Sequence, residues 1–127
     1  MKKVLLVEDD KKISMAISMS LKAMGYEIVS ASDAVTATSQ ARQHDFDVVV
    51  LDINLPGGDG FVVAERLQRL VTTANVPIVF ITASKQPGLR ERAEEMGCVH
   101  FLEKPFDVGQ LADALETATQ AVSGQIG

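Results

Sequence analysis

The sequence predicts an α/β fold of the doubly wound kind, in which helices cover both faces of one five-stranded parallel sheet. Short apolar runs alternate five times with segments in which apolar residues recur at helical spacing. The runs are apolar throughout rather than at every second residue, which is typical of strands buried on both faces of a parallel sheet. The chain has 127 residues, of which 46% are hydrophobic, so we expect one domain with a substantial core.

The first two strand–helix units are expected within residues 4–43. The first strand is expected over residues 4–7, and the helix after it is expected to end at Gly25. The residues expected on the buried side of this helix are Ile13, Ala16, Ile17, Leu21 and Met24. The second strand is expected over residues 26–31, and Asp33 is expected to cap a helix that ends near Gln43. The residues expected to be buried on this second helix are Ala34, Ala37, Thr38 and Ala41.

The third and fourth units follow the same pattern. The third strand is expected over residues 47–51, and Asp59, at the end of a glycine-rich loop, is expected to cap the third helix. The residues expected to face inward on this helix are Phe61, Ala64, Leu67 and Val71. The fourth strand is expected over residues 77–81, and its helix over residues 87–96, before Gly97.

The fifth unit completes the expected domain. Its strand is expected over residues 99–103, and Asp107 is expected to cap the last helix. The apolar stripe of that helix consists of Leu111, Ala114, Leu115, Ala118 and Val122. Residues 1–122 are therefore expected to form the domain, and residues 123–127 a tail or the beginning of a linker.

The charge balance and the single cysteine argue against several classes of protein. The chain carries 12 basic and 17 acidic residues, a formal net charge of −5, which argues against a nucleic-acid-binding surface on this domain. Cys98 is the only cysteine, so no internal disulfide is expected, and a cytoplasmic location is consistent with this. The first apolar run is too short for a signal peptide, and no run approaches the roughly 18 residues of a membrane span.

Polar side chains follow four of the five predicted strands at the point where each strand ends. They are Glu8, Asp9 and Asp10 after the first strand, Asp52 after the third, Thr82 after the fourth and Lys104 after the fifth. Right-handed crossovers place the carboxyl ends of parallel strands at one edge, where ligands of such sheets bind. Carboxylates gathered in one crevice need a cation to offset them, and Mg²⁺ prefers such oxygen ligands. The sequence therefore predicts a site for a magnesium ion and a phosphoryl group.

Each of these groups also has an ordinary structural interpretation. The acidic run alone is compatible with a solvated helix cap, and Asp52 alone with a cap of the loop that follows it. Thr82 alone is typical of a strand-end hydroxyl bonded to the backbone, and Lys104 alone is typical of a surface lysine. Their occurrence at one predicted edge favours the binding site.

Four short motifs follow the predicted strands in a specific order. They are Val7-Glu8-Asp9-Asp10, the segment from Asp52 to Gly60, Thr82-Ala83 and Lys104-Pro105-Phe106. Each motif is weak alone, but all four in this order make the sequence resemble the receiver domains of response regulators in two-component signalling, over essentially its whole length. The resemblance implies a flavodoxin-like (βα)5 sandwich whose parallel strands have the order 2-1-3-4-5.

The resemblance implies a role for each acidic residue in the crevice. Asp52 is expected to accept a phosphoryl group from a phosphohistidine. Asp9 is expected to be the main carboxylate ligand of Mg²⁺, supported by Glu8, while Asp52 and the backbone carbonyl of Asn54 complete the protein's ligands. In-line phosphoryl transfer needs alignment and charge neutralisation, which such an ion provides.

The resemblance also implies a switch. Thr82 is expected to donate its hydroxyl to one phosphoryl oxygen, and Lys104 is expected to pair with another. The peptide bond between Lys104 and Pro105 is expected to be cis. The small Ala83 leaves room for the phosphoryl donor. Movement of Thr82 is expected to let Phe101 turn inward and to change the surface formed by the fourth helix, the fifth strand and the fifth helix. Phe101 lacks a hydroxyl, so this switch would depend on packing.

The partners that the resemblance implies are proteins. The phosphoryl donor is expected to be a sensor histidine kinase or a phosphotransfer protein, and the receiving partner a downstream output domain or target protein. No nucleic acid and no membrane is expected to bind this domain. Residues 111–122 lack the basic side chains through which many DNA-binding regulators dimerise, so a monomer or weak dimer is expected. The chain is expected to catalyse only its own phosphorylation and dephosphorylation, and so not to be an enzyme with turnover.

Three other functions fit parts of the sequence. A phosphatase of the haloacid-dehalogenase type needs an aspartate two residues after its nucleophile, where this chain has Asn54, which cannot act as a general acid. A flavodoxin-like FMN binder needs a phosphate loop of Ser, Thr and Gly where this chain has three acids after its first strand. A degenerate receiver that is never phosphorylated is disfavoured by the presence of Asp9, Asp52, Thr82 and Lys104.

Overall fold

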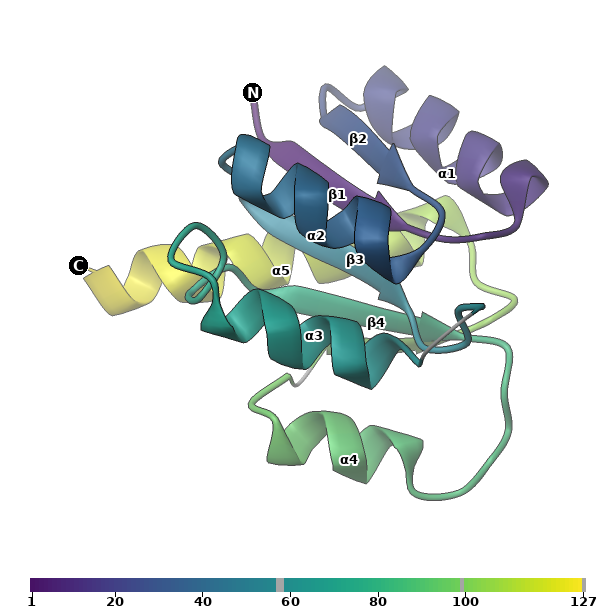
Figure 1. The fold of residues 1–127 in the computed structure, drawn as a ribbon. Coiled ribbons are helices and arrows are strands. Elements are labelled where there is room, and N and C mark those ends of the chain that lie inside the picture. Colours follow the sequence, from purple (N-terminus) through teal and green to yellow (C-terminus); the bar gives the residue numbers. More distant parts are fainter. Residues whose placement is uncertain (57–58, 99, 127) are drawn as a thin grey trace.

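The computed structural model describes residues 1–56, 59–98 and 100–126, and it confirms the predicted alternation of strands and helices (Figure 1). The strands are β1 (Lys3–Val7), β2 (Glu27–Ala31), β3 (Val48–Asp52), β4 (Ile78–Thr82) and β5 (His100–Glu103). The helices are α1 (Lys11–Ala23), α2 (Ala34–Gln43), α3 (Gly60–Arg69), α4 (Leu89–Glu95) and α5 (Val108–Ile126). The strands are parallel and have the order β2-β1-β3-β4-β5, as the resemblance implied.

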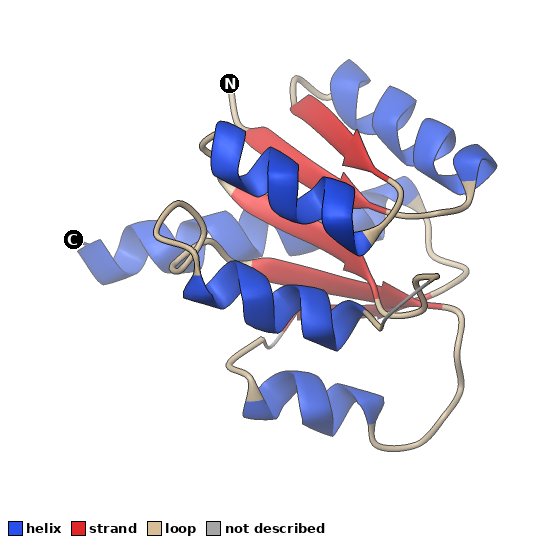
Figure 2. Cartoon of the chain, viewed as in Figure 1, coloured by secondary structure: helices blue, strands red, loops and turns tan. Residues whose placement is uncertain are grey.

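Helices cover both faces of the sheet, as predicted (Figure 2). Neighbouring residues of the central strands alternate between two cores. Leu5 and Leu51 belong to the core that includes residues of α2, α3 and α4, whereas Val4 and Val50 belong to the core that includes residues of α1 and α5. Burial on both faces explains why these strands are apolar at every position. None of the helices in the described residues is long and apolar enough to cross a membrane.

The register of the strands aligns the residues at their carboxyl ends. The pairs nearest that edge are Val7–Leu51, Asp52–Ile81 and Thr82–Glu103. Glu8, the residue after β1, therefore lies level with Asp52 at the end of β3. Lys104, the residue after β5, lies just beyond the level of Thr82. The topology thus brings all four predicted strand-end positions to one edge of the sheet.

The predicted helix caps are confirmed, and a fourth cap divides the acidic run. The predicted caps accept backbone N–H groups at Oδ1: Asp33 from Thr36 (2.7 Å), Asp59 from Val62 (3.0 Å) and Asp107 from Gln110 (2.8 Å). Asp10 caps α1 by accepting from the N–H groups of Lys12 and Ile13 at 2.9 and 3.1 Å. The cap interpretation of the acidic run therefore holds for Asp10, and Glu8 and Asp9 are left for the crevice.

Three apolar residues that were expected on buried helix faces are exposed, and one of them is Ala16 of α1. The prediction that Val71 faces inward is wrong, because α3 ends at Arg69 and Val71 lies in the turn beyond it, 98% exposed. The prediction for Met24 is also wrong, because α1 ends at Ala23 and Met24 is 51% exposed. Helical spacing says nothing about burial once the helix has ended.

Some predicted features reach or pass the limits of what the structure describes. Val99, the expected first residue of the fifth strand, and residues 57–58 of the expected loop lie outside the described residues. Helix α5 continues to Ile126, past the expected domain boundary, while the side chain of Val122 lies outside the description. The assignment of residues 123–127 to a tail or linker stays a prediction.

Gly60 is expected to tolerate no side chain, because α3 begins directly against β3. A Cβ atom at Gly60 would lie 2.4 Å from the carbonyl oxygen of Asp52 and 2.8 Å from the Cα of Ile53. Backbone atoms cannot move aside cheaply, so Gly60→Ala is expected to lower the free energy of unfolding by about 3 kcal/mol in urea titrations. The control is Gly109→Ala, whose Cβ would meet only the Asp107 carboxylate, at 3.1 Å. An equal decrease in the free energy of unfolding of the two variants would contradict this account.

Candidate functional site

Three carboxylates meet where β1 and β3 end. Glu8 and Asp52 are buried, with 2% and 3% of their surface exposed, whereas Asp9 is exposed to solvent. One oxygen atom of each carboxylate lies within 4.8 Å of the corresponding atoms of the other two. The predicted acidic crevice is therefore present, and Asp9 is its member nearest to solvent.

Lys104 reaches the two buried carboxylates from the end of β5. Its Nζ donates to Glu8 Oε1 at 2.5 Å and to Asp52 Oδ2 at 3.0 Å. Its backbone N–H donates to the carbonyl oxygen of Thr82 at 2.7 Å, and its peptide bond to Pro105 is cis, as predicted. The Lys104 side chain is only 14% exposed, so solvent screens these two ion pairs weakly.

Burial and neighbouring charges shift the pKa values of this pair of groups. Burial raises the pKa of Glu8 to about 7; the hydrogen bond from Lys104 opposes this shift, and the proximity of Asp52 adds to it. Burial alone would lower the pKa of Lys104, but its bonds to the two carboxylates outweigh burial and raise it. One ammonium group faces three carboxyl groups, so the crevice attracts a further cation.

Glu8 is expected to make stability depend on pH in metal-free buffer. The folded protein holds the Glu8 proton more tightly than the unfolded chain between the ordinary pKa of 4.5 and about 7. The free energy of unfolding is therefore expected to fall as the pH rises through this range, by of the order of 2 kcal/mol. Urea titrations in EDTA should show this fall in the wild type, and a smaller fall in Glu8→Gln.

The exposed Glu91 of α4 supplies the control for this pH dependence. Glu91→Gln removes one exposed carboxylate that is not part of the acidic cluster, and it should keep the pH dependence of the wild type. If Glu8→Gln also keeps it, the folded protein does not retain a proton on Glu8, and the electrostatic description of the crevice is wrong.

Thr82 is fully buried, and its hydroxyl points to Asn54. Thr82 Oγ1 donates to Asn54 Oδ1 at 2.7 Å and accepts from the Ser84 N–H at 3.0 Å. The backbone N–H of Asn54 donates to Asp52 Oδ1 at 2.9 Å. The sequence places Thr82 at the crevice but contains no signal for its bond to the Asn54 side chain, because that bond depends on the rotamers of a strand-end residue and of a residue in a separate loop. The role of the Asn54 carbonyl as a metal ligand stays a prediction.

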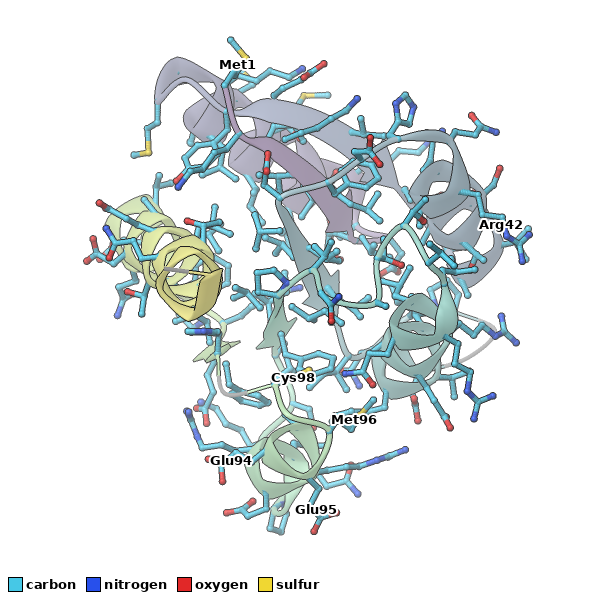
Figure 3. The ribbon with its side chains drawn as sticks, turned by 90° about the vertical axis from the view of Figure 1, so that its left-hand side faces the viewer. Met1, Arg42, Glu94, Glu95, Met96 and Cys98 are labelled. Carbon is cyan, nitrogen blue, oxygen red and sulfur yellow. The ribbon has the colours of Figure 1, made fainter. Side chains whose placement is uncertain are left out.

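Phe101 is buried where α4 covers β5. The guanidinium carbon of Arg90 lies 4.8 Å from the centroid of the Phe101 ring, a distance typical of a cation–π contact. Sequence reasoning found Phe101 and missed Arg90, which had no motif to identify it. Figure 3 shows α4 at the periphery of the molecule, with Met96 and Cys98 on its inner side. The short α4 is thus partly held by a surface arginine stacked on the predicted switch residue.

An apolar groove of about 480 Å³ opens beside Lys104, between α1 and the segment that leads into α5. Its lining residues are Ile13, Ala16, Ile17, Ser20, Ala83, Lys104, Pro105, Phe106 and Val108. Met15 and Met19 of α1 are also exposed apolar residues. The groove was not predicted, because its walls come from segments that are far apart in the sequence. An apolar surface next to the crevice is typical of a site where a partner protein docks.

The residues of the crevice fit a magnesium ion. The carboxylates of Glu8, Asp9 and Asp52 are hard oxygen donors close enough to share one cation, and their charge exceeds that of Lys104. The exposed Asp9 gives the ion a route to water ligands, several of which Mg²⁺ usually keeps.

The family model for the response regulator receiver domain matches residues 4–116. The chain is similar to the transcriptional regulatory protein PdtaR of Mycobacterium tuberculosis, with 36% identity over 118 residues that cover 92% of this chain and 56% of the relative. It is also similar to the DNA-binding dual master transcriptional regulator RpaA of Synechocystis sp., with 35% identity over 87% of this chain and 46% of the relative. This chain thus spans about half the length of these curated relatives.

Solved structures with the same fold include a chemotaxis protein and a kinase receiver. CheY4 of Vibrio cholerae has a TM-score of 0.87 and 30% identity, covering 93% of this chain and 98% of that one. The receiver domain of the sensor histidine kinase PA1611 of Pseudomonas aeruginosa has a TM-score of 0.85 and 28% identity, covering 94% and 98% of the two chains. That structure has a magnesium ion coordinated in its active site cleft.

Proposed function

This chain belongs to the response regulator receiver domain family, and we propose that Asp52 is its phosphoacceptor in a two-component phosphorelay. The observation that carries the proposal is the setting of Asp52, which is buried, faces two further carboxylates and accepts a hydrogen bond from Lys104. The reaction is the Mg²⁺-dependent transfer of a phosphoryl group from a phosphohistidine to an Asp52 oxygen, with release of the histidine. The chain acts only on itself and is not an enzyme with turnover.

Four groups of this chain would hold the magnesium ion. They are the carboxylates of Glu8, Asp9 and Asp52 and the backbone carbonyl of Asn54. When bound, the ion supplies positive charge that offsets repulsion between the attacking carboxylate and the phosphoryl oxygens. Lys104, already bonded to Asp52 Oδ2, is close enough to pair with a phosphoryl oxygen on that carboxylate. Thr82 donates its hydroxyl to another, and the exposed Ala83 leaves the approach open.

The donor is a sensor histidine kinase or a phosphotransfer protein. The apolar groove beside Lys104 supports this part of the proposal, because it offers a docking surface directly at the mouth of the crevice. A donor helix that buries its apolar side in this groove would place its phosphohistidine against Asp52. Docking of this kind aligns the two reactants before transfer.

Phosphorylation changes the surface formed by α4, β5 and α5, and a downstream output domain or target protein binds that surface. Phe101 and its contact with Arg90 support this part, because they link the strand beside Thr82 to α4. In residues 108–126, α5 carries no lysine or arginine, so we propose a monomer or weak dimer. The domain works in the cytoplasm and binds neither nucleic acid nor membrane.

Beryllofluoride, which mimics a phosphoryl group on a carboxylate, tests the proposed function. With Mg²⁺, the amide NMR signals of α4, β5 and α5 are expected to shift in the wild type. Asp52→Asn, which removes the acceptor, is expected to show no such shift, and EDTA should abolish the response of the wild type. A wild type that does not respond, or an Asp52→Asn variant that responds equally, would contradict the proposal.

A further inference from the structure

Asn54 links the proposed phosphoacceptor to Thr82, through its backbone on one side and its side chain on the other. Its backbone N–H donates to Asp52 Oδ1 at 2.9 Å, and its Oδ1 accepts the Thr82 hydroxyl at 2.7 Å. We infer that Asn54 is a positioning residue, which holds the Thr82 hydroxyl in a resting orientation until a phosphoryl oxygen on Asp52 replaces it as the acceptor. This inference rests on the proposed function of Asp52.

Asn54 and a phosphoryl oxygen would compete for the Thr82 hydroxyl, because a hydroxyl group has a single proton. Thr82 Oγ1 already accepts from the Ser84 N–H at 3.0 Å, so its own O–H is the donor that remains. In the described part of the chain, that O–H donates to Asn54 Oδ1. One hydroxyl proton forms one strong hydrogen bond, so the bond to Asn54 and a bond to a phosphoryl oxygen exclude each other.

Burial makes this choice of acceptor matter. Thr82 has no exposed surface, and a buried hydroxyl without an acceptor is unfavourable. The Thr82 carbonyl also accepts from the Lys104 N–H at 2.7 Å, which holds its backbone at the end of β4. The change of acceptor is therefore expected to occur by rotation of the Thr82 side chain. A phosphoryl oxygen is charged and is a stronger acceptor than an amide oxygen. The bond to Asn54 therefore reduces the free energy that the Thr82 hydroxyl gains by bonding to the phosphoryl group, but it does not prevent the change of acceptor.

Four proteins test the inference: the wild type, Asn54→Ala, Thr82→Val and the double variant. Asn54→Ala removes the acceptor but keeps the backbone carbonyl, and Thr82→Val removes the donor at nearly constant shape. The measured quantity is the dissociation constant of beryllofluoride with Mg²⁺, from NMR titration. Asn54→Ala is expected to bind beryllofluoride about fivefold more tightly than the wild type. The double variant is expected to bind it within about twofold of Thr82→Val. The same change in both backgrounds, or weaker binding by Asn54→Ala, overturns the inference.

A second measurement uses the protein without Mg²⁺ or beryllofluoride. In the wild type the Thr82 hydroxyl proton should exchange slowly with water, and the side-chain torsion should have one dominant value. Asn54→Ala should speed the exchange and redistribute the torsion, as seen in the Thr82 methyl signal. An unchanged Thr82 signal overturns the inference even if beryllofluoride binds. If no protein binds beryllofluoride, the proposed function fails, and this second measurement alone decides whether Asn54 positions Thr82.

Discussion

Lys104→Met is expected to lower the free energy of unfolding by about 3 kcal/mol at pH 8 in metal-free buffer. The substitution leaves the buried carboxylates of Glu8 and Asp52 without the ammonium group that lies 2.5 and 3.0 Å from them. Because burial and Asp52 raise the Glu8 pKa, protonation of Glu8 should relieve part of the loss at pH 5. Mg²⁺ should stabilise Lys104→Met more than the wild type, since the ion can replace the missing charge.

Lys85→Met is the matched control for this result. Lys85 also pairs with a glutamate, Glu103, at 3.4 Å, but the two side chains are 76% and 51% exposed. An exposed pair of this kind contributes less than about 0.5 kcal/mol, so Lys85→Met should unfold almost like the wild type. The electrostatic account of the crevice fails if the two variants lose the same stability, or if Lys104→Met is as stable as the wild type at pH 8.

Asp9→Asn is expected to weaken Mg²⁺ binding at least about tenfold, measured by calorimetric titration. Asp9 is the exposed member of the three carboxylates, so its substitution removes a charged ligand without emptying a buried site. The free energy of unfolding in EDTA should therefore change by less than about 0.5 kcal/mol. Weaker Mg²⁺ binding with nearly unchanged stability distinguishes a metal ligand from a residue that only supports the fold.

Asp10→Asn provides the control from the next position along the chain. Asp10 caps α1 with its Oδ1, and asparagine caps helices equally well. The variant removes the same charge in nearly the same place, yet its Mg²⁺ affinity should stay within about twofold of the wild type. Equal weakening by the two substitutions would mean that general acidity, and not ligation by Asp9, attracts the ion.

The side chains that meet at the carboxyl edge of the sheet could be predicted from the sequence, because their meeting depends on topology. In a parallel sheet with helical crossovers, every strand ends on the same side, so Glu8, Asp52, Thr82 and Lys104 had to approach each other once the strands were identified. Apolar runs and helix caps identified those strands and their helices well. The division of the acidic run was not predictable, since the sequence Glu8-Asp9-Asp10 does not say which acid caps α1.

Features that depend on side-chain orientation escaped prediction. The bond from Thr82 to Asn54 and the stacking of Arg90 on Phe101 join residues whose rotamers no motif encodes. The exposure of Val71 followed from the end of α3, two residues earlier than the apolar spacing suggested. Sequence patterns thus located the strand ends, and packing decided which side chains meet there.

The central claim, that Asp52 is the phosphoacceptor, is tested most directly by the mass of the intact protein after incubation with acetyl phosphate and Mg²⁺. The wild type is expected to gain the mass of one phosphoryl group, and to gain none when EDTA is present. Asp52→Asn is expected to gain none under either condition. A wild type that stays unmodified, or an Asp52→Asn variant that is modified as fully as the wild type, would contradict the account.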